Sequence, residues 1–282
     1  MTTTSSSGAP TLGNLAGTVM LVGAGKMGGA ILEGWLALGL QPQRIIVLEP
    51  QPSREIAALT GRGLRINPTP NSIRDVAAIL IALKPQVAPD VVPALARYVG
   101  PETVVISIMA GRPLEFLTAT LNTSAALVRA MPNTPAAIGR GITVVVPNPV
   151  VSPNQRELVH ALLSATGAVE WIVDETLMDA VTAVSGSGPA YVFLLAEALA
   201  QAGLAAGLPK ELAARLARAT VAGSGELLHR SPLDPATLRQ NVTSPGGTTA
   251  AALGLLMGTE GLESLLTKAV IAATRRSREL AG

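Results

Sequence analysis

Residues 18–29 of the chain read TVMLVGAGKMGG and decide the fold. The first five form an uncharged, largely apolar run, which predicts a buried strand. Glycines follow in the spacing G-x-G-x-x-G, and residues 30–38 read as a helix. In a dinucleotide-binding unit such glycines permit a tight turn, the approach of a pyrophosphate and close packing of the helix on the strand. The predicted cofactor contacts are Gly23, Gly25, Lys26, Met27 and Gly28. The alternative interpretation is a plain glycine-rich turn.

Further strand signals follow at regular intervals along the first part of the chain. They lie at residues 44–48, 77–83, 104–108, 126–130, 142–146 and 169–173. Strands that alternate with helical stretches predict an α/β fold with a Rossmann-like, doubly wound and mostly parallel sheet. After Asp174 the strand signals disappear and helices dominate. We therefore expect a disordered tail at 1–17, a dinucleotide-binding domain at 18–173 and an all-α dimerisation domain at 174–282.

Glu49 ends the second predicted strand and lies 21 residues after Gly28. This is close to the usual spacing of the acidic residue that accepts hydrogen bonds from the ribose 2′-hydroxyl. A carboxylate there repels a 2′-phosphate, which favours NADH modestly over NADPH, so both remain candidate cofactors. Two alternatives stay open: Glu49 is simply solvated in a proline-rich loop, or nearby Arg54 serves a phosphate.

The helix predicted at residues 189–206 is apolar nearly all round, with Glu197 as the main exception. A helix without a polar face is typically buried on all sides. A domain the size of 174–282 cannot bury every such face internally, so we expect it to form a subunit interface. Three more helices are predicted. Two begin at Pro209 and Pro235, and the last covers residues 260–280.

The turn at residues 241–249 reads NVTSPGGTT and sits between two helical segments. Pro245 fixes one φ angle, and the two glycines free the next two positions. Thr248 or Thr249 can cap the following helix. Backbone N–H groups at the positive end of a helix form an anion site that suits a carboxylate. The alternative is an ordinary interhelical turn.

This turn is very similar to the signature of the pyrroline-5-carboxylate reductases, the enzymes of the last step of proline synthesis. Three other segments also resemble that family: the strand ending in Lys84-Pro85, the block MPNTP at 131–135, and DAVTAVSGSGPAY at 179–191. The resemblance runs in order through residues 18–280. It implies reduction of the C=N bond of a cyclic imino acid by NADH or NADPH, giving L-proline.

The resemblance also implies roles for individual residues. Thr249 is the implied donor to the imine nitrogen, and Lys84 lies at the cleft shared by cofactor and substrate. Further implied cofactor contacts are Asn71 at the adenosine ribose, Asn133 beside the nicotinamide, and Ala82, Pro85 and Ala110. The substrate carboxylate is expected at Ser244, Gly246, Gly247, Thr248 and Thr249. Family members intertwine the C-terminal helices in a homodimer whose subunits both contribute to each cleft, and some form a decamer of five dimers.

Composition excludes several other classes of protein. Hydrophobic residues make up 48% and charged residues 14% of the chain, with a net charge of +2 and only 2% aromatic residues. Binding of nucleic acid by a basic face with stacking rings is therefore not expected. The absence of cysteine excludes disulfides and thiolate metal ligands, and the isolated His160 and His229 predict neither a metal site nor a serine-histidine triad.

No membrane span or export signal is expected from the sequence. The longest uncharged apolar run, residues 76–83, is too short to cross a bilayer. Residues 1–17 lack the basic start and apolar core of a signal peptide and the arginines of a transit peptide, which predicts a cytoplasmic protein.

Two rival functions remain at this point. β-Hydroxyacid dehydrogenases share a similar glycine-rich start but use a lysine inside a helix of their second domain, and the helix at 189–206 has no lysine. The second rival is a dinucleotide-sensing protein that kept the fold and lost turnover. The presence of Thr249 and Lys84 argues against such a loss.

Overall fold

The computed structural model describes residues 12–13, 15–121 and 124–281. Most of the predicted disordered tail, residues 1–11 and 14, lies outside the described residues. Its end is not disordered, however, because Leu12 is buried with 2% exposure and donates its N–H to the Leu38 carbonyl at 3.1 Å. The ordered chain thus begins to pack before the predicted boundary at Gly17.

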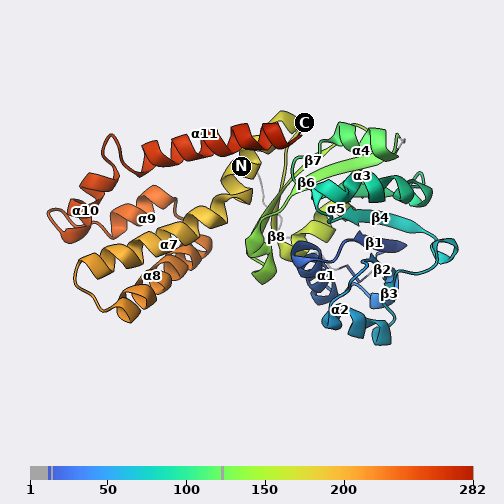
Figure 1. The fold of residues 1–282 in the computed structure, drawn as a ribbon, viewed down its shortest axis with the longest axis horizontal. Helices are drawn as coiled ribbons and strands as arrows, with labels where there is room; N and C mark the ends of the chain where they lie inside the picture. The colour runs from blue at the N-terminus through green and yellow to red at the C-terminus, as the bar shows by residue number, and fades with distance from the viewer. Residues whose placement is uncertain (1–11, 14, 122–123, 282) are drawn as a thin grey trace, which may run out of the picture. The chain divides into compact units, whose positions relative to one another are not determined.

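An eight-stranded sheet forms the first part of the chain (Figure 1), with the order β3-β2-β1-β4-β5-β6-β7-β8. All neighbouring strands are parallel except β6 and β7. The strands are β1 (Thr18–Val22), β2 (Ile45–Leu48), β3 (Arg65–Ile66), β4 (Val76–Ile81), β5 (Val104–Ser107), β6 (Ala126–Met131), β7 (Gly141–Pro147) and β8 (Gly167–Trp171). The predicted Rossmann-like, mostly parallel sheet is confirmed.

Helices cover both faces of this sheet. Their bounds are α1 (Lys26–Ala37), α2 (Arg54–Ala58), α3 (Ala88–Val91), α4 (Leu114–Leu121), α5 (Pro153–Leu163) and α6 (Met178–Val181). Short helical turns connect them: η1 (Pro42–Arg44), η2 (Leu59–Arg62), η3 (Pro70–Ser72), η4 (Pro85–Val87), η5 (Val92–Tyr98), η6 (Thr134–Ile138), η7 (Ser164–Thr166), η8 (Glu175–Leu177) and the π-helical η9 (Thr182–Gly186).

Alternate residues of β1 contribute to two separate cores. Val19 and Leu21 pack in a cluster that includes buried side chains of α1 and α5, such as Trp35. Met20 and Val22 pack in a second cluster with side chains of α3 and α4. Side chains of a strand point alternately to the two faces, so a strand buried on both faces reads as a continuous apolar run. This explains why the sequence at β1 lacks a polar alternation.

The chain divides into two compact units. The first contains the sheet, up to Gly186, together with the chain end from Arg275. The second, residues 187–274, is helical. Its elements are α7 (Gly188–Ala205), α8 (Lys210–Arg230), α9 (Pro235–Asn241), α10 (Thr248–Leu256) and the larger part of α11 (Leu262–Ala281). The predicted helices after Pro209 and Pro235 are therefore present.

Helix α7 exposes apolar side chains on the single chain. None of its residues is buried, and Phe193 and Leu194 are 63% and 62% exposed. One chain alone therefore leaves this helix largely exposed, which agrees with the expectation that a single domain cannot bury every face of it. Helix α8 is its principal neighbour. That packing is close where Gly203 faces Ala213: a Cβ added to Gly203 would stand 3.3 Å from the Ala213 Cβ.

A continuous helical stretch, Glu175–Ala205, includes α7 and was not expected as a candidate span. By length and composition alone it could cross a membrane, and it is the one such stretch among the residues that the structure describes. Core helices of globular proteins meet the same criteria, so these properties do not by themselves indicate a membrane span.

Candidate functional site

The glycines of the turn between β1 and α1 have different surroundings, and each is suited to its position for a different reason. Gly23 adopts φ +88°, and a Cβ there would stand 2.7 Å from the Ala82 carbonyl oxygen. A Cβ on Gly28 would overlap the Gly23 carbonyl oxygen. Gly25, by contrast, has no atom within 4 Å of the place a Cβ would take. The turn is therefore tight at Gly23, closely packed at Gly28 and open at Gly25, as a dinucleotide turn requires.

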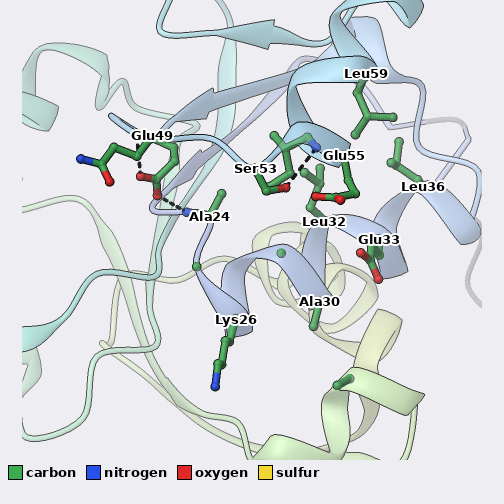
Figure 2. A pocket seen from close by; sticks show the side chains of 15 residues that line it. Ala24, Lys26, Ala30, Leu32, Glu33, Leu36, Glu49, Ser53, Glu55 and Leu59 are labelled. Atoms are coloured by element: carbon green, nitrogen blue, oxygen red, sulfur yellow. Dashed lines mark hydrogen bonds between the residues drawn. The ribbon is translucent and has the colours of Figure 1, made fainter.

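Helix α1 begins at Lys26, earlier than the predicted start at residue 30. Its N-cap is Gly25, which has no side chain to accept from the first amide groups. These N–H groups lack intrahelical partners and lie at the positive end of the helix, so they suit a phosphate oxygen. Lys26 is exposed, and Met27 packs partly against the core. In the view of Figure 2, Lys26 extends from the turn on the side away from Glu49.

Glu49 follows β2 and holds the glycine-rich turn directly. Its Oε2 accepts the Ala24 N–H at 2.8 Å, and its Oε1 accepts the Gln51 N–H at 3.0 Å (Figure 2). The alternative that Glu49 is merely a solvated residue is therefore wrong. Both carboxylate oxygens still have lone pairs for a ribose hydroxyl, so Glu49 can position the turn and contact the ribose together.

A groove of about 730 Å³ opens beside this turn, between α1 and the segment that follows β2. Its lining includes Glu33, Glu49 and Glu55, and Lys26 is the only basic residue among the described residues that line it. A hydrogen bond from the Ser53 hydroxyl lowers the pKa of Glu55, which favours the ionised form of this carboxylate. The groove is thus predominantly acidic, and this charge opposes binding of the 2′-phosphate that distinguishes NADPH from NADH.

Three other predicted cofactor segments follow the ends of β4, β5 and β6. Because β1, β2, β4, β5 and β6 are parallel, these ends share one edge of the sheet with the glycine-rich turn. Residues at this edge are Ala82, Lys84 and Pro85 after β4, Ala110 after β5 and Asn133 after β6. The carboxyl edge of a doubly wound sheet is where ligands bind.

Two side chains fix the segments at this edge. Arg112 donates twice to the Pro85 carbonyl, from Nε at 3.3 Å and Nη2 at 3.0 Å, and its guanidinium lies 4.7 Å from the centre of the Phe116 ring. Asn133 accepts the Ile142 N–H through Oδ1 at 3.0 Å. Sequence reasoning did not find Arg112, because nothing in its local pattern reveals a contact with a residue of another loop.

The two asparagines between β3 and β4 have different surroundings. Asn71 lies exposed in η3, on the connection that leads to the start of β4. Asn67 directly follows β3 and hydrogen-bonds to both backbone groups of Glu49. The structure therefore places Asn67 beside Glu49, at the edge of the sheet that carries the glycine-rich turn. The sequence analysis did not identify Asn67 as a site residue.

The turn at residues 241–249 lies in the second compact unit. Gly246 adopts φ +69°, and a Cβ on Gly247 would stand 2.5 Å from the Ser244 Oγ. The N-cap of α10 is Gly247, with no side-chain capping bond. The prediction that Thr248 or Thr249 caps this helix is therefore wrong: both are already helical. Their first-turn amides consequently lie at an uncapped, positive helix end, where a carboxylate binds favourably.

Comparisons with known proteins identify the family of the chain. A model of pyrroline-5-carboxylate reductase dimerisation matches residues 175–280, and one for coenzyme F420-dependent NADP oxidoreductase matches residues 18–111. The pyrroline-5-carboxylate reductase of Synechocystis sp. is 43% identical over 262 residues, which cover 92% of this chain and 97% of the relative. The chain belongs to the pyrroline-5-carboxylate reductase family.

Solved structures of pyrroline-5-carboxylate reductases also share the fold. The enzyme from Coxiella burnetii is 32% identical with a TM-score of 0.87, covering 95% of this chain and 100% of that one. The Plasmodium falciparum enzyme, solved with NADP bound, is 28% identical with a TM-score of 0.78, covering 96% and 99%. The predicted family and fold class are confirmed, including a C-terminal dimerisation region.

Proposed function

We propose that this protein reduces 1-pyrroline-5-carboxylate to L-proline with NADH or NADPH, as the last step of proline biosynthesis. The observation that carries the proposal is the uncapped start of α10, which offers amide groups to a substrate carboxylate. It occurs in a chain whose sheet presents a dinucleotide turn and that belongs to the reductase family.

The residues of the sheet edge fit a nicotinamide dinucleotide. The open space at Gly25 and the uncapped amides of α1 suit its pyrophosphate, and Glu49 suits the adenosine ribose. Lys84, Pro85, Ala110 and Asn133 lie at the neighbouring strand ends. Asn71, the contact of the ribose that the family implies, lies instead on the connection between β3 and β4. When bound, the reduced cofactor supplies a hydride, which carries both electrons needed to reduce the C=N bond.

The chain's own groups bind the substrate and supply a hydrogen bond. The first-turn amides near Ser244, Gly246 and Gly247 hold the carboxylate. The imine carbon accepts the hydride, and the nitrogen gains one proton in all, which balances the conversion of C=N to CH–NH. We assign the hydrogen bond to this nitrogen to the Thr249 hydroxyl, because an uncharged donor stabilises the developing electron density without adding a buried charge.

We further propose that the exposed apolar helices of residues 174–281 form a homodimer. Leu194 on α7, Leu255 on α10 and Ile271 on α11 are 62%, 82% and 63% exposed on the single chain. Apolar patches of this kind mark interfaces, and two-fold pairing is the commonest solution. A ring of five dimers is the larger assembly the family implies. We also propose that the protein is cytoplasmic, with the apolar helix α7 covered by the second subunit.

The proposed activity is tested with purified protein, pyrroline-5-carboxylate and NADH or NADPH. We expect substrate-dependent oxidation of the cofactor and formation of proline. Oxidation of a β-hydroxyacid with NAD⁺ in place of this reaction would support the dehydrogenase rival. Cofactor binding without turnover on either substrate would support the sensor.

Glu49→Ser is expected to raise the ratio of kcat/KM for NADPH to that for NADH by about tenfold, equivalent to about 1.4 kcal/mol. The reason is the loss of a carboxylate that repels the 2′-phosphate. Because Glu49 also accepts the Ala24 N–H, the serine variant should bind both cofactors more weakly than wild type.

Glu49→Gln separates these two effects, since the amide oxygen can still accept the Ala24 N–H without carrying a charge. Its cofactor ratio should shift as in the serine variant, with smaller losses in absolute affinity. An unchanged ratio in both variants would mean that the charge of Glu49 does not select the cofactor, and would direct attention to Arg54.

A further inference from the structure

Asn67 brackets the backbone of Glu49 with a pair of hydrogen bonds. Its Oδ1 accepts the Glu49 N–H at 3.0 Å, and its Nδ2 donates to the Glu49 carbonyl at 2.8 Å. The Asn67 N–H in turn donates to the Val47 carbonyl at 2.9 Å. One side chain therefore completes the pairing between the ends of β2 and β3, where the short β3 has no further residues to offer.

The backbone of Asn67 is in the left-handed region, with φ +44°. This conformation is uncommon for residues other than glycine, although asparagine tolerates it better than most. Such a conformation persists only where the surrounding structure enforces it, and it often accompanies a functional site. Here it lets the Asn67 side-chain amide reach back to the end of β2, where the acidic residue of the cofactor groove stands.

Glu49 in turn contacts the glycine-rich turn through its side chain. Its carboxylate accepts the N–H of Ala24, which lies between Gly23 and Gly25, at 2.8 Å. Asn67, Glu49 and Ala24 thus form a continuous chain of hydrogen bonds across three strand ends. We propose that Asn67 is a positioning residue that sets the Glu49 carboxylate for selection between NADH and NADPH.

This inference rests on the proposed use of these cofactors. A carboxylate discriminates against a 2′-phosphate only if it is held near the ribose, since its repulsion falls with distance and with exposure to water. Loss of the Asn67 amide leaves the Glu49 backbone free to shift. The carboxylate then spends more time away from the groove, and the penalty for a 2′-phosphate decreases.

The test uses Asn67→Gly in the full-length protein, because glycine adopts the same positive φ without strain. Dissociation constants for NADH and NADPH are measured by titration, together with the midpoint of thermal unfolding. We expect the preference for NADH over NADPH to fall about threefold to tenfold, the range of one or two exposed hydrogen bonds. A purely structural role would lower the unfolding midpoint and leave the ratio unchanged.

Asp75→Gly is the matched control. Asp75 is the other described non-glycine residue with positive φ, at +53°, and its carbonyl accepts the Thr18 N–H at the opposite edge of the sheet. This variant should leave the cofactor ratio at its wild-type value. A shift in both variants would overturn the proposal, since any loosening of the connection between β3 and β4 would then suffice.

A second measurement places Asn67→Gly in the Glu49→Gln background. If Asn67 acts through the Glu49 carboxylate, its replacement should change the cofactor ratio little once that charge is gone. An equal change in both backgrounds, or an unchanged ratio in the single variant, would overturn the proposal. Wild-type protein that binds neither cofactor would instead contradict the proposed function itself.

Discussion

Thr249→Val is expected to lower kcat by roughly 10²-fold, the lower end of the contribution typical of a positioned proton donor. The affinity for NADH should change little, because the glycine-rich turn of the sheet is untouched. Thr249 is half-buried in the first turn of α10, and its hydroxyl is not used to cap that helix. It is therefore free to serve the imine nitrogen, which gains electron density as the C=N bond is reduced.

Two variants check that this loss belongs to the hydroxyl at Thr249. Thr249→Ser keeps a hydroxyl and should recover a large part of kcat. Thr243→Val makes the same substitution in the same turn, but the Thr243 hydroxyl already donates to the Arg239 carbonyl at 2.7 Å. The Thr243 variant should turn over close to wild type. Wild-type kcat in Thr249→Val would remove Thr249 from the chemistry.

Leu195→Lys is expected to abolish the dimer and the activity together. Leu195 lies on α7 and is 50% exposed on the single chain, so we place it in the proposed interface. A charge left unpaired on burial costs about 3–5 kcal/mol, and two-fold symmetry applies this cost twice. Activity should fall with the dimer, because the resemblance to the family implies that both subunits contribute to each cleft.

Light scattering and the reductase assay measure the two effects on the same sample. Val173→Lys is the control, because Val173 is 94% exposed and precedes the dimerisation region matched at residues 175–280. It should keep both the dimer and the turnover. A wild-type protein that is fully active as a stable 28.7 kDa monomer would contradict this account.

The sheet could be predicted from the sequence because its central strands are buried on both faces. Largely apolar runs such as residues 76–81 and 104–107 indicate such strands, because a strand buried on both faces does not alternate apolar with polar residues. Strand β3 escaped prediction because Arg65 and Ile66 are only half-buried and too few to form a run. Its position is set by pairing with β2, which is a long-range contact.

Local propensity misplaced the start of α1 and the cap of α10. Glycine disfavours a helix by propensity, yet Gly28 lies inside α1. Only glycine fits at this position, because a Cβ would overlap the Gly23 carbonyl oxygen. At α10, Thr248 and Thr249 are good capping residues, but both are already helical and the cap is Gly247, where a Cβ would stand 2.5 Å from the Ser244 Oγ. In both places a glycine stands where a Cβ would come too close to a neighbouring atom, and this contact is not visible in the local sequence.

The candidate site was predicted where a motif or a resemblance marked it. The spacing that pointed to Glu49 was correct about its place after β2, but not informative about its bond to Ala24. Asn67 and Arg112 carry no local signal, because each acts on a backbone group of another loop. Contacts of this kind depend on how strand ends converge, and only the folded chain shows them.

The most direct test of the proposed reaction follows the transferred hydrogen itself. Wild-type protein is incubated with pyrroline-5-carboxylate and NADH or NADPH that carries deuterium at the transferring position of the nicotinamide, and the product is analysed by mass spectrometry. We expect proline with one deuterium on the ring carbon that was part of the C=N bond. Oxidation of the cofactor without labelled proline, or no turnover with either cofactor, would contradict it.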